Sequence, residues 1–365
     1  MTNEVAFEVC VLPGDGIGVE VTEAALEVLR AVEAKVGGFR LQLTNHPAGA
    51  FCHRDTGEAL PAATQAAADR ADAILLGAMG QPEIRNADGT EIAPQLDLRF
   101  RYGLYAGVRP CRALSGGPLA LRHPRAAEID FVLIRESTEG LFASRGKGEL
   151  IDDREARDTQ VITRATSERL FDFAFGLAER RKTQGRPGKV TLVDKANVFR
   201  SFAFFRKVFD ERAARFPGIA AERLYVDACA LDLVRRPWEF DVLVTENMFG
   251  DILSDLAAGL VGGMGFAASA DIGDANAVFQ PAHGTAPDIA GQGKANPTAA
   301  LLSAAMMLDW LAERKNVAAA AQAARLIEKA VGAVFAGGRA RPFDAGGRDG
   351  TRAMTDAVLA ELGRG

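Results

Sequence analysis

Residues 240–255 read FDVLVTENMFGDILSD, and the rest of the chain is organised around this stretch. Its first six residues predict a buried strand, and an amphipathic helix is expected to follow. Asp251 and Asp255 are four residues apart, so on a helix they project from the same face. Two carboxylates this close repel each other unless a cation lies between them, and their oxygens suit Mg²⁺ or Mn²⁺. The stretch therefore predicts a metal site, the alternative being a solvated helix face.

Length and composition indicate a globular protein of more than one domain. The 365 residues predict two domains, or one domain split by an insertion. A net charge of −5 argues against nucleic-acid binding. No apolar run reaches the roughly 18 residues of a membrane span, and no signal peptide is evident. The four cysteines lack CxxC spacing, so we expect a reduced, cytoplasmic protein without a zinc site.

The first strand, residues 8–12, runs into the glycine-rich turn PGDGIG at residues 13–18. Apolar residues recur at helical spacing over residues 19–34. A strand, a glycine-rich turn and a helix commonly bind phosphate or a nucleotide, because amides at the helix N-terminus face the turn. The spacing is not GxGxxG, and no acidic residue ends a second strand about 20 residues later. A Rossmann fold is therefore not predicted.

The remaining apolar patterns alternate between strands and helices. Strands are predicted at residues 40–43, 73–78, 131–136, 189–193 and 223–226, and helices at residues 64–70, 167–181, 296–314, 317–335 and 353–362. Lys195 and Asp227 follow two of these strands, and open α/β sheets build their sites from such strand ends. Lys195 by itself fits either a buried base or an ordinary surface lysine. Residues 259–273, rich in glycine, alanine and serine, are predicted to cross between domains.

Arginines are concentrated in LRFRYGLYAGVRP, residues 98–110. Arg99, Arg101 and Arg109 are costly to bury in so apolar a stretch unless anions accompany them. Arg135 ends another predicted strand and raises the count. Because guanidinium groups pair bidentately with carboxylates, the set predicts a receptor for a di- or tricarboxylate. The alternative is that these arginines flank strands at the surface.

Taken together, eight motifs resemble the β-decarboxylating dehydrogenases, the isocitrate/isopropylmalate dehydrogenase family, with the pattern closest to its isopropylmalate branch. In chain order they are PGDGIGVEV, LRFRYGLYAGVRP, RESTEG, VDKANV, YVDA, ENMFGDILSD, HGTAPDIAGQGKANPTA and GGRDGT, and they cover essentially the whole chain. The resemblance implies a two-domain α/β/α sandwich with one large mixed sheet. Residues 1–104 and 262–365 would form a discontinuous cofactor-binding domain. Residues 105–261 would form a smaller domain with the dimer interface and the metal and substrate residues.

The resemblance also implies an activity, the NAD-dependent oxidative decarboxylation of a 3-substituted malate with Mg²⁺ or Mn²⁺. Lys195 would accept the proton of the substrate hydroxyl. In the family, this lysine and the YVDA aspartate reach the site of the partner subunit, so a homodimer with shared sites is implied. The other residues carried over are Arg99, Arg109 and Arg135 for the substrate carboxylates and Asp227, Asp251 and Asp255 for the metal.

The loop at residues 281–291, PAHGTAPDIAG, resembles the adenosine-binding loop of the family. Asp288 would accept hydrogen bonds from the ribose hydroxyls, with Ile289 packed nearby. NADP-dependent relatives place a lysine and a tyrosine at these two positions, so the resemblance implies NAD. The remaining cofactor residues implied are Gly14 and Ile17 on the nicotinamide side, His283 and Gly284 in the loop, and Asn296 at the adenine.

One departure from the family pattern affects the chemistry. Seven residues after the arginine of RESTEG, the family has a tyrosine that donates or relays a proton to the enol. This chain has Phe142 there, which lacks a hydroxyl. General acid catalysis contributes roughly 10²- to 10⁴-fold. We therefore expect either a water-mediated proton donor or a slow decarboxylation step.

A second departure concerns substrate selection. Isopropylmalate enzymes present two leucines shortly before the first arginine, and isocitrate enzymes present a serine and an asparagine. Here only Leu96 fits the apolar pattern, and Gln95 could hydrogen-bond a polar substituent. Gly103 and Gly107 also replace an acidic residue and an asparagine. A D-malate, tartrate, isocitrate or homoisocitrate type of substrate remains an alternative, as does a non-catalytic regulatory member of the family.

Overall fold

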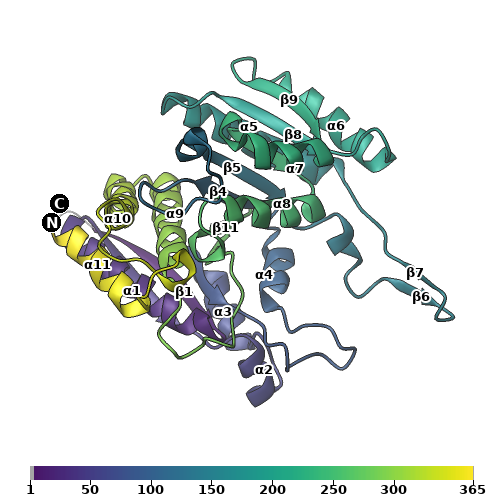
Figure 1. Cartoon of the computed structure of the whole chain (residues 1–365). Coiled ribbons are helices and arrows are strands. Elements are labelled where there is room, and N and C mark those ends of the chain that lie inside the picture. Colours follow the sequence, from purple (N-terminus) through teal and green to yellow (C-terminus); the bar gives the residue numbers. More distant parts are fainter. Residues whose placement is uncertain (1–3, 365) are drawn as a thin grey trace.

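One mixed sheet of ten strands runs through the part of the chain that the computed structural model describes, residues 4–364 (Figure 1). The strand order is β2-β1-β3-β12-β11-β4-β5-β10-β8-β9. β11 is antiparallel to both of its neighbours, and β4 is antiparallel to β5, whereas the other pairs are parallel. The α/β class and the large mixed sheet are thus confirmed.

Most strands of the sheet are followed by a helix, the exceptions being β4 and β11, which lead to the next strand of the sheet without an α-helix. The strands of the sheet are β1 (Val5–Gly14), β2 (Phe39–Asn45), β3 (Ala73–Ala78), β4 (Ala106–Arg112), β5 (Asp130–Glu136), β8 (Lys189–Asp194), β9 (Ala220–Tyr225), β10 (Val242–Thr245), β11 (Ala268–Ile272) and β12 (Ala277–Pro281). The helices are α1 (Ile17–Val36), α2 (Ala50–Thr56), α3 (Ala62–Arg70), α4 (Pro94–Tyr102), α5 (Arg164–Thr183), α6 (Arg200–Ala213), α7 (Val226–Arg235), α8 (Asn247–Leu260), α9 (Thr298–Lys315), α10 (Ala318–Ala336) and α11 (Thr351–Arg364).

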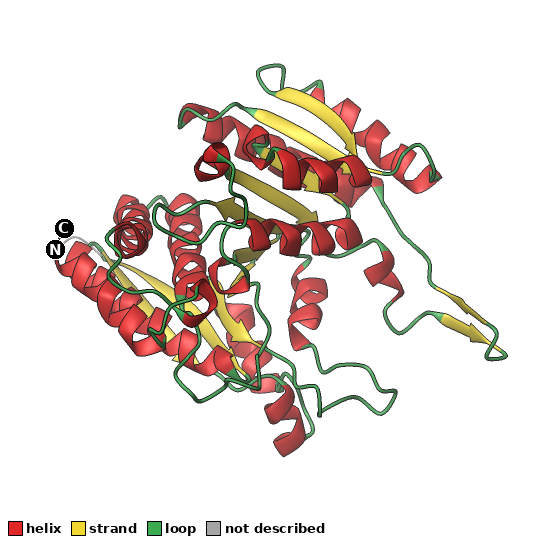
Figure 2. Ribbon diagram, in the orientation of Figure 1, coloured by secondary structure: helices red, strands yellow, loops and turns green. Residues whose placement is uncertain are grey.

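Helices cover both faces of the sheet, as Figure 2 shows, because alternate side chains of each strand point to opposite faces. In β1, Phe7 and Val9 pack into the core with α1 and α9, whereas Cys10 and Leu12 pack on the other face with α3 and α4. The second half of the sheet repeats this arrangement, with α5 and α6 on one face and α7 and α8 on the other. The result is a three-layer sandwich.

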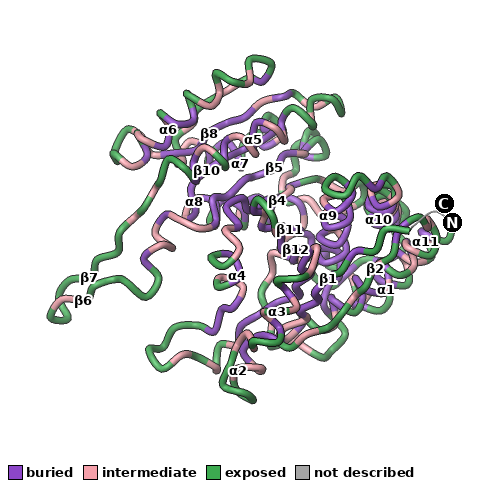
Figure 3. The backbone as a smooth tube through the Cα atoms, turned by 180° about the vertical axis from the view of Figure 1, so that it is seen from behind, coloured by how far each residue is buried: buried purple, intermediate pink, exposed green. Residues whose placement is uncertain are grey.

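The two halves of the sheet come from different parts of the chain. Segments before residue 105 and after residue 261 supply β2, β1, β3, β12 and β11, and the intervening segment supplies β4, β5, β10, β8 and β9. The division into two domains at these positions stays a prediction. The short strands β6 (Glu149–Ile151) and β7 (Glu155–Arg157) pair only with each other in a hairpin that projects from the body and is largely exposed (Figures 1 and 3).

Asp227 follows the strand β9, as predicted, and lies in the first turn of α7. The strand β11 and the helix α4 were not predicted. Residues 259–273 contain β11, whose mostly small side chains carry little hydrophobic signal. Arg99 lies on a nine-residue helix, α4, that opens with Pro94 and closes at Gly103 in the left-handed conformation. Within residues 4–364, no helix is long and apolar enough to cross a membrane.

Candidate active site

Three buried arginines meet at the centre of the sheet. Arg99 comes from α4, Arg109 from β4 and Arg135 from the end of β5, and they are only 8%, 8% and 4% exposed. β4 and β5 are neighbours in the sheet, which brings the second and third arginines together. Arg101 differs, because its guanidinium is exposed and pairs with Asp69 at 2.6 Å. The surface alternative therefore applies to Arg101 alone among the four.

Asp271 on β11 lies between two of these arginines, and the sequence motifs had not singled it out. Its carboxylate is 3.0 Å from Arg99 Nε and 3.1 Å from Arg109 Nη2. Burial by itself raises the pKa of Asp271, but the positive charges of Arg99, Arg109 and Arg135 outweigh burial and lower that pKa to about 2. The group is therefore a fixed negative charge inside the arginine cluster.

Arg135 connects this cluster to α8. Its Nε and Nη2 donate to Asn247 Oδ1 at 2.9 and 2.7 Å, and its Nη1 donates to the Asp251 carboxylate. Gly250 permits this close approach, because a Cβ there would lie 2.6 Å from Arg135 Cγ. Burial, followed by repulsion from Arg99, lowers the pKa of Arg135 to about 10. A negatively charged ligand beside it would be strongly favoured.

Asp251 and Asp255 lie one turn apart on α8, as predicted from their spacing. The helix begins at Glu246, whose carboxylate accepts the backbone N–H groups of Phe249 and Met248. Burial and the charge of Asp251 raise the pKa of Asp255. Two carboxylates whose charges disfavour each other, with oxygen donors only, fit a hard divalent cation.

Lys195 and Asp227 are the other two residues predicted to carry chemistry. Lys195 follows β8, Asp227 lies at the start of α7, and the two side chains form an ion pair with each other. This hydrogen bond lowers the pKa of Asp227. Within the described chain, no three histidine, cysteine or acidic side chains are grouped closely enough to hold a metal. A single chain therefore does not bring Asp227 together with Asp251 and Asp255.

The predicted nucleotide-binding turn and loop lie side by side. The Ile17 N–H donates to the Thr285 carbonyl at 2.9 Å, which joins the turn after β1 to the 281–291 loop. Gly14 has a positive φ of 74°, and a Cβ there would lie 1.9 Å from the Ala78 carbonyl oxygen. Nδ1 of His283 is 2.9 Å from the Gly284 carbonyl oxygen, while its Nε2 is buried without a partner in the described chain. Burial lowers the pKa of His283, so a neutral ring faces this region.

The remaining cofactor candidates lie further along the same loop. Asp288 is exposed, and Ile289 is half-buried against the core. Asn296 is buried, and its Nδ2 lies 3.2 Å from both carboxylate oxygens of Asp344, while its Oδ1 accepts the Thr298 N–H. Asp344 lies in a 3-10 turn, Phe343–Ala345, and had not been predicted. Asp344 and Asn296 are 48 residues apart in the sequence, so only the fold brings them together.

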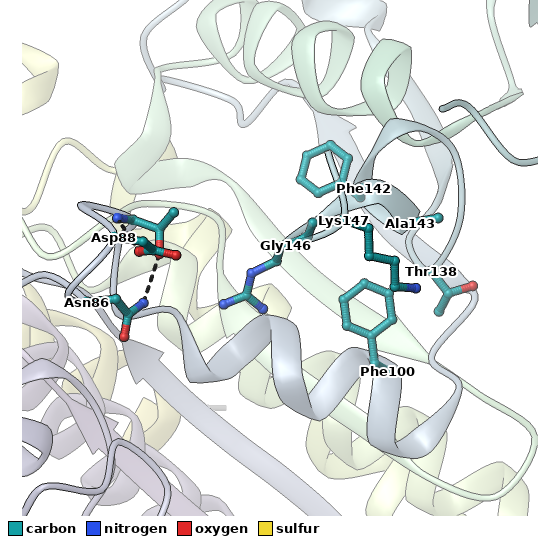
Figure 4. A pocket seen from close by; sticks show the side chains of 10 residues that line it. Asn86, Asp88, Phe100, Thr138, Phe142, Ala143, Gly146 and Lys147 are labelled. Atoms are coloured by element: carbon teal, nitrogen blue, oxygen red, sulfur yellow. Dashed lines mark hydrogen bonds between the residues drawn. The ribbon is translucent and has the colours of Figure 1, made fainter. Parts of the chain in front are cut away.

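A cavity of about 580 Å³ (Figure 4) is lined in part by Phe142, whose ring lies against Arg135. Phe142, Thr138 and Phe100 line one side of it, together with Ala143, Arg145, Gly146 and Lys147, and Asn86, Asp88 and Thr90 line the other. The predicted selecting residues Gln95 and Leu96 lie instead at the start of α4, outside the wall of this cavity. The Oε1 atom of Gln95 is buried without a hydrogen-bond partner in the described chain.

Known proteins resemble this chain over nearly all of its length. Residues 8–358 match the family model described as isocitrate/isopropylmalate dehydrogenase. A 3-isopropylmalate/3-methylmalate dehydrogenase of Methanocaldococcus jannaschii is 42% identical over 97% of this chain and 98% of its own. The 3-isopropylmalate dehydrogenase of Moorella thermoacetica is 43% identical over 92% of both chains.

Solved structures give the same result. The isocitrate dehydrogenase of Methylococcus capsulatus superposes with a TM-score of 0.84 at 37% identity, covering 98% of this chain and 99% of its own. A β-decarboxylating dehydrogenase of Thermococcus kodakarensis superposes with a TM-score of 0.80 at 35% identity, covering 98% of this chain and 96% of its own.

Proposed function

The chain belongs to the isocitrate/isopropylmalate dehydrogenase family, and we propose that it catalyses the NAD-dependent oxidative decarboxylation of a 3-substituted malate. The observation that carries the proposal is the cluster of Arg99, Arg109 and Arg135 beside the carboxylates of Asp251 and Asp255. Buried guanidinium groups bind carboxylates, and the aspartate pair supplies oxygen ligands for Mg²⁺ or Mn²⁺. A substrate with carboxylates and a hydroxyl group matches both parts.

Different residues of the chain bind the substrate, accept its proton and hold the metal. Arg99, Arg109 and Arg135 orient the substrate carboxylates, and Lys195 accepts the proton of the hydroxyl group. Asp251 and Asp255, with Asp227, would hold the divalent cation. When bound, that cation supplies Lewis-acid stabilisation of negative charge on substrate oxygen, and the nicotinamide accepts a hydride. Phe142, which cannot donate a proton, leaves protonation of the enol to water or to another group.

We propose that the active sites are shared between two copies of the chain. Lys195 and Asp227 pair with each other, and within the described residues they form no three-ligand group with Asp251 and Asp255, which supports a site completed by a second copy. Strongly exposed apolar side chains support this. They are Val198 (59%) and Phe199 (52%) just before α6, Leu231 (53%) and Val234 (49%) on α7, and Ile252 (62%) on α8. Exposed apolar surface of this kind favours association. The proposed unit is a homodimer.

We further propose NAD as the cofactor and a cytoplasmic location. Asp288 would accept hydrogen bonds from the ribose hydroxyls, and its negative charge would repel the 2′-phosphate of NADP. Gly14, Ile17, His283 and Gly284 would lie along the nicotinamide half, with Ile289 and Asn296 at the adenosine. The cavity beside Phe142 has room for the malate substituent. Isopropylmalate or methylmalate is the leading substrate, as the names of the relatives suggest, with D-malate, tartrate, isocitrate and homoisocitrate as alternatives.

A substrate panel tests the proposal. NADH formation and CO₂ release would be followed together for 3-isopropylmalate, 3-methylmalate, D-malate, tartrate, isocitrate and homoisocitrate, with Mn²⁺ or with a chelator. Metal-dependent turnover of one malate supports the proposal and identifies the substituent. No turnover with either NAD or NADP, combined with equal Mn²⁺ affinity of the wild type and of Asp251→Asn, would contradict it and favour a non-catalytic family member.

A further inference from the structure

We propose that Asp271 determines both the positioning and the charge of the substrate site, acting as a built-in carboxylate that fits it to malates with two carboxylates. The inference rests on the proposed function, because it assigns the substrate class of the same site. Asp271 is 1% exposed and lies on β11, between β12 and β4 in the sheet. It is a positioning residue, since it acts on the substrate through the arginines.

Asp271 has a complete set of donors around it. Besides Arg99 and Arg109, Gln280 Nε2 donates to its Oδ2 at 3.1 Å, and Ser137 Oγ lies 3.4 Å from its Oδ1. These partners come from α4, β4, β12 and the segment after β5. A buried carboxylate surrounded in this way is held rigidly, and it holds the two guanidinium groups in turn.

Gly107 makes room for this carboxylate. It is the register partner of Asp271 on β11 and of Arg135 on β5, so it lies between them in the sheet. A Cβ at residue 107 would lie 2.5 Å from Ser137 Oγ and 3.1 Å from Asp271 Oδ1. A side chain here would therefore have to displace the hydroxyl and press on the carboxylate. The glycine and the aspartate form one local arrangement.

Asp271 also limits what the arginines can still bind. Arg109 donates its Nη1 to the carbonyl groups of Ala270 and Val108 and its Nη2 to Asp271. Arg99 gives only its Nε to Asp271 among the described residues, which leaves both of its terminal nitrogens for a ligand. The hydrogen-bond donors left by Asp271 thus direct a substrate carboxylate to Arg99.

The charge of Asp271 also limits how many substrate carboxylates the arginine cluster can accept. Asp271 offsets one of the three positive charges of the arginines, and Asp251, paired with Arg135, offsets a second. Little positive charge is left over, so a third substrate carboxylate would add negative charge to a poorly hydrated site that already holds a fixed carboxylate. Two basic residues, Arg145 and Lys147, line the cavity beside Phe142. Arg145 is already paired with Asp97 at 2.9 Å.

The test compares two ligands that differ by one carboxylate. The affinities of 3-isopropylmalate and isocitrate, each with Mn²⁺ and without NAD, would be measured by calorimetry for the wild type and for Asp271→Asn. We expect the wild type to bind isopropylmalate more tightly, and Asp271→Asn to shift the affinity ratio roughly tenfold toward isocitrate. An unchanged ratio in a folded variant, or a wild type that prefers isocitrate, would overturn the inference.

Two further variants separate this effect from general damage. Asp241→Asn removes another fully buried carboxylate, which pairs with Arg181 at 2.6 Å at the start of β10, so we expect its ligand ratio to stay that of the wild type. Gly107→Ala keeps every charge but presses on Asp271, so we expect KM to rise several-fold while kcat and the ligand ratio stay nearly constant. A change in ratio for Asp241→Asn, or a loss confined to kcat in Gly107→Ala, would contradict the assignment.

Failure of the proposed function can be distinguished from failure of the role inferred for Asp271. If the wild type binds neither ligand and turns over no malate, the proposed function itself fails. If the wild type turns over a malate but the ligand ratio does not respond to Asp271→Asn, only the inference about Asp271 fails.

Discussion

The guanidinium carbon of Arg135 lies 5.0 Å from the centre of the Phe142 ring. The nitrogens of the same guanidinium donate to Asn247 and Asp251, while the phenyl ring lies against its face. The contact is a cation–π interaction, and Phe142 also lines the cavity. A hydroxyl on this ring would therefore lie beside the groups that bind substrate.

Phe142→Tyr is expected to speed the protonation of the enol. The new hydroxyl supplies a general acid at a position where the wild type has none, and such groups contribute roughly 10²- to 10⁴-fold when fully positioned. We expect formation of the keto-acid product to rise at least tenfold relative to CO₂ release if protonation of the enol is slow in the wild type. Parallel assays of NADH, CO₂ and the keto acid measure this. Phe100→Tyr, which adds a hydroxyl to another ring of the same cavity, is the matched control and should change neither rate.

Mixed dimers test whether the active sites are shared. Lys195→Ala and Asp251→Asn should each inactivate the homodimer, because each removes one half of every site. A heterodimer of the two variants would contain one site with both halves intact and one with neither. We expect such heterodimers, purified with two different tags, to recover about half of the wild-type activity, since one of two sites is restored. Heterodimers as inactive as the parents would show that each chain builds its own site.

The preference for NAD is expected to depend on Asp288. Replacing this exposed carboxylate removes the group proposed to bind the ribose hydroxyls and to repel a 2′-phosphate. The double variant Asp288→Lys/Ile289→Tyr should therefore lower kcat/KM for NAD at least tenfold and raise it for NADP, an effect of roughly 1.4 kcal/mol or more on each transition state. Steady-state kinetics with both cofactors measures the ratio. An unchanged ratio would place the adenosine elsewhere.

Asp15 should matter for stability rather than chemistry. Its buried carboxylate accepts the backbone N–H groups of Ala50, Phe51 and Gly80, which ties α2 and the end of β3 to the turn after β1. In Asp15→Asn an amide NH₂ replaces one acceptor, so at least one buried donor loses its partner, at about 1–3 kcal/mol. Chemical denaturation should show this loss. Asp88→Asn, at an exposed carboxylate that also accepts a backbone N–H, should lose less than about 1 kcal/mol.

Glu136 is expected to make stability depend on pH. Burial raises the pKa of its carboxyl from 4.5 to about 7, although hydrogen bonds from Thr138 and Glu139 act in the opposite direction. Between these two pH values the folded state holds a proton that the unfolded state releases, so the free energy of unfolding decreases as pH rises through this window. Relative to Glu136→Gln, the wild type should lose roughly 2 to 3 kcal/mol between pH 4.5 and pH 7.5.

Denaturation of both proteins at pH 4.5, 6 and 7.5 measures this difference. Glu136→Gln keeps the side-chain size and cannot ionise, so pH effects from all other groups cancel in the comparison. A wild type that instead gains stability over the variant as pH rises would mean that the hydrogen bonds of Thr138 and Glu139 dominate over burial.

Much of the fold was predictable because its signals are local. The strand at residues 73–78 and the helices that start near residues 17, 164 and 318 follow from apolar spacing over a few turns. The strand β11 and the helix α4 were missed, because five small residues and nine mixed ones carry too little pattern to be recognised. The spacing of Asp251 and Asp255 also predicted their place on one helix face.

Motifs along the chain were enough to identify the family, most of the strands and helices, and the residue types proposed to bind carboxylates and a divalent cation. Which charges are neighbours became clear only from the folded chain. Arg99 meets Asp271 across 172 positions, and Lys195 pairs with Asp227 rather than joining Asp251. Sequence patterns reflect only contacts between residues within one or two turns of each other. The order of strands in the sheet decides which distant side chains share a buried space, and burial decides how strongly their charges act on each other.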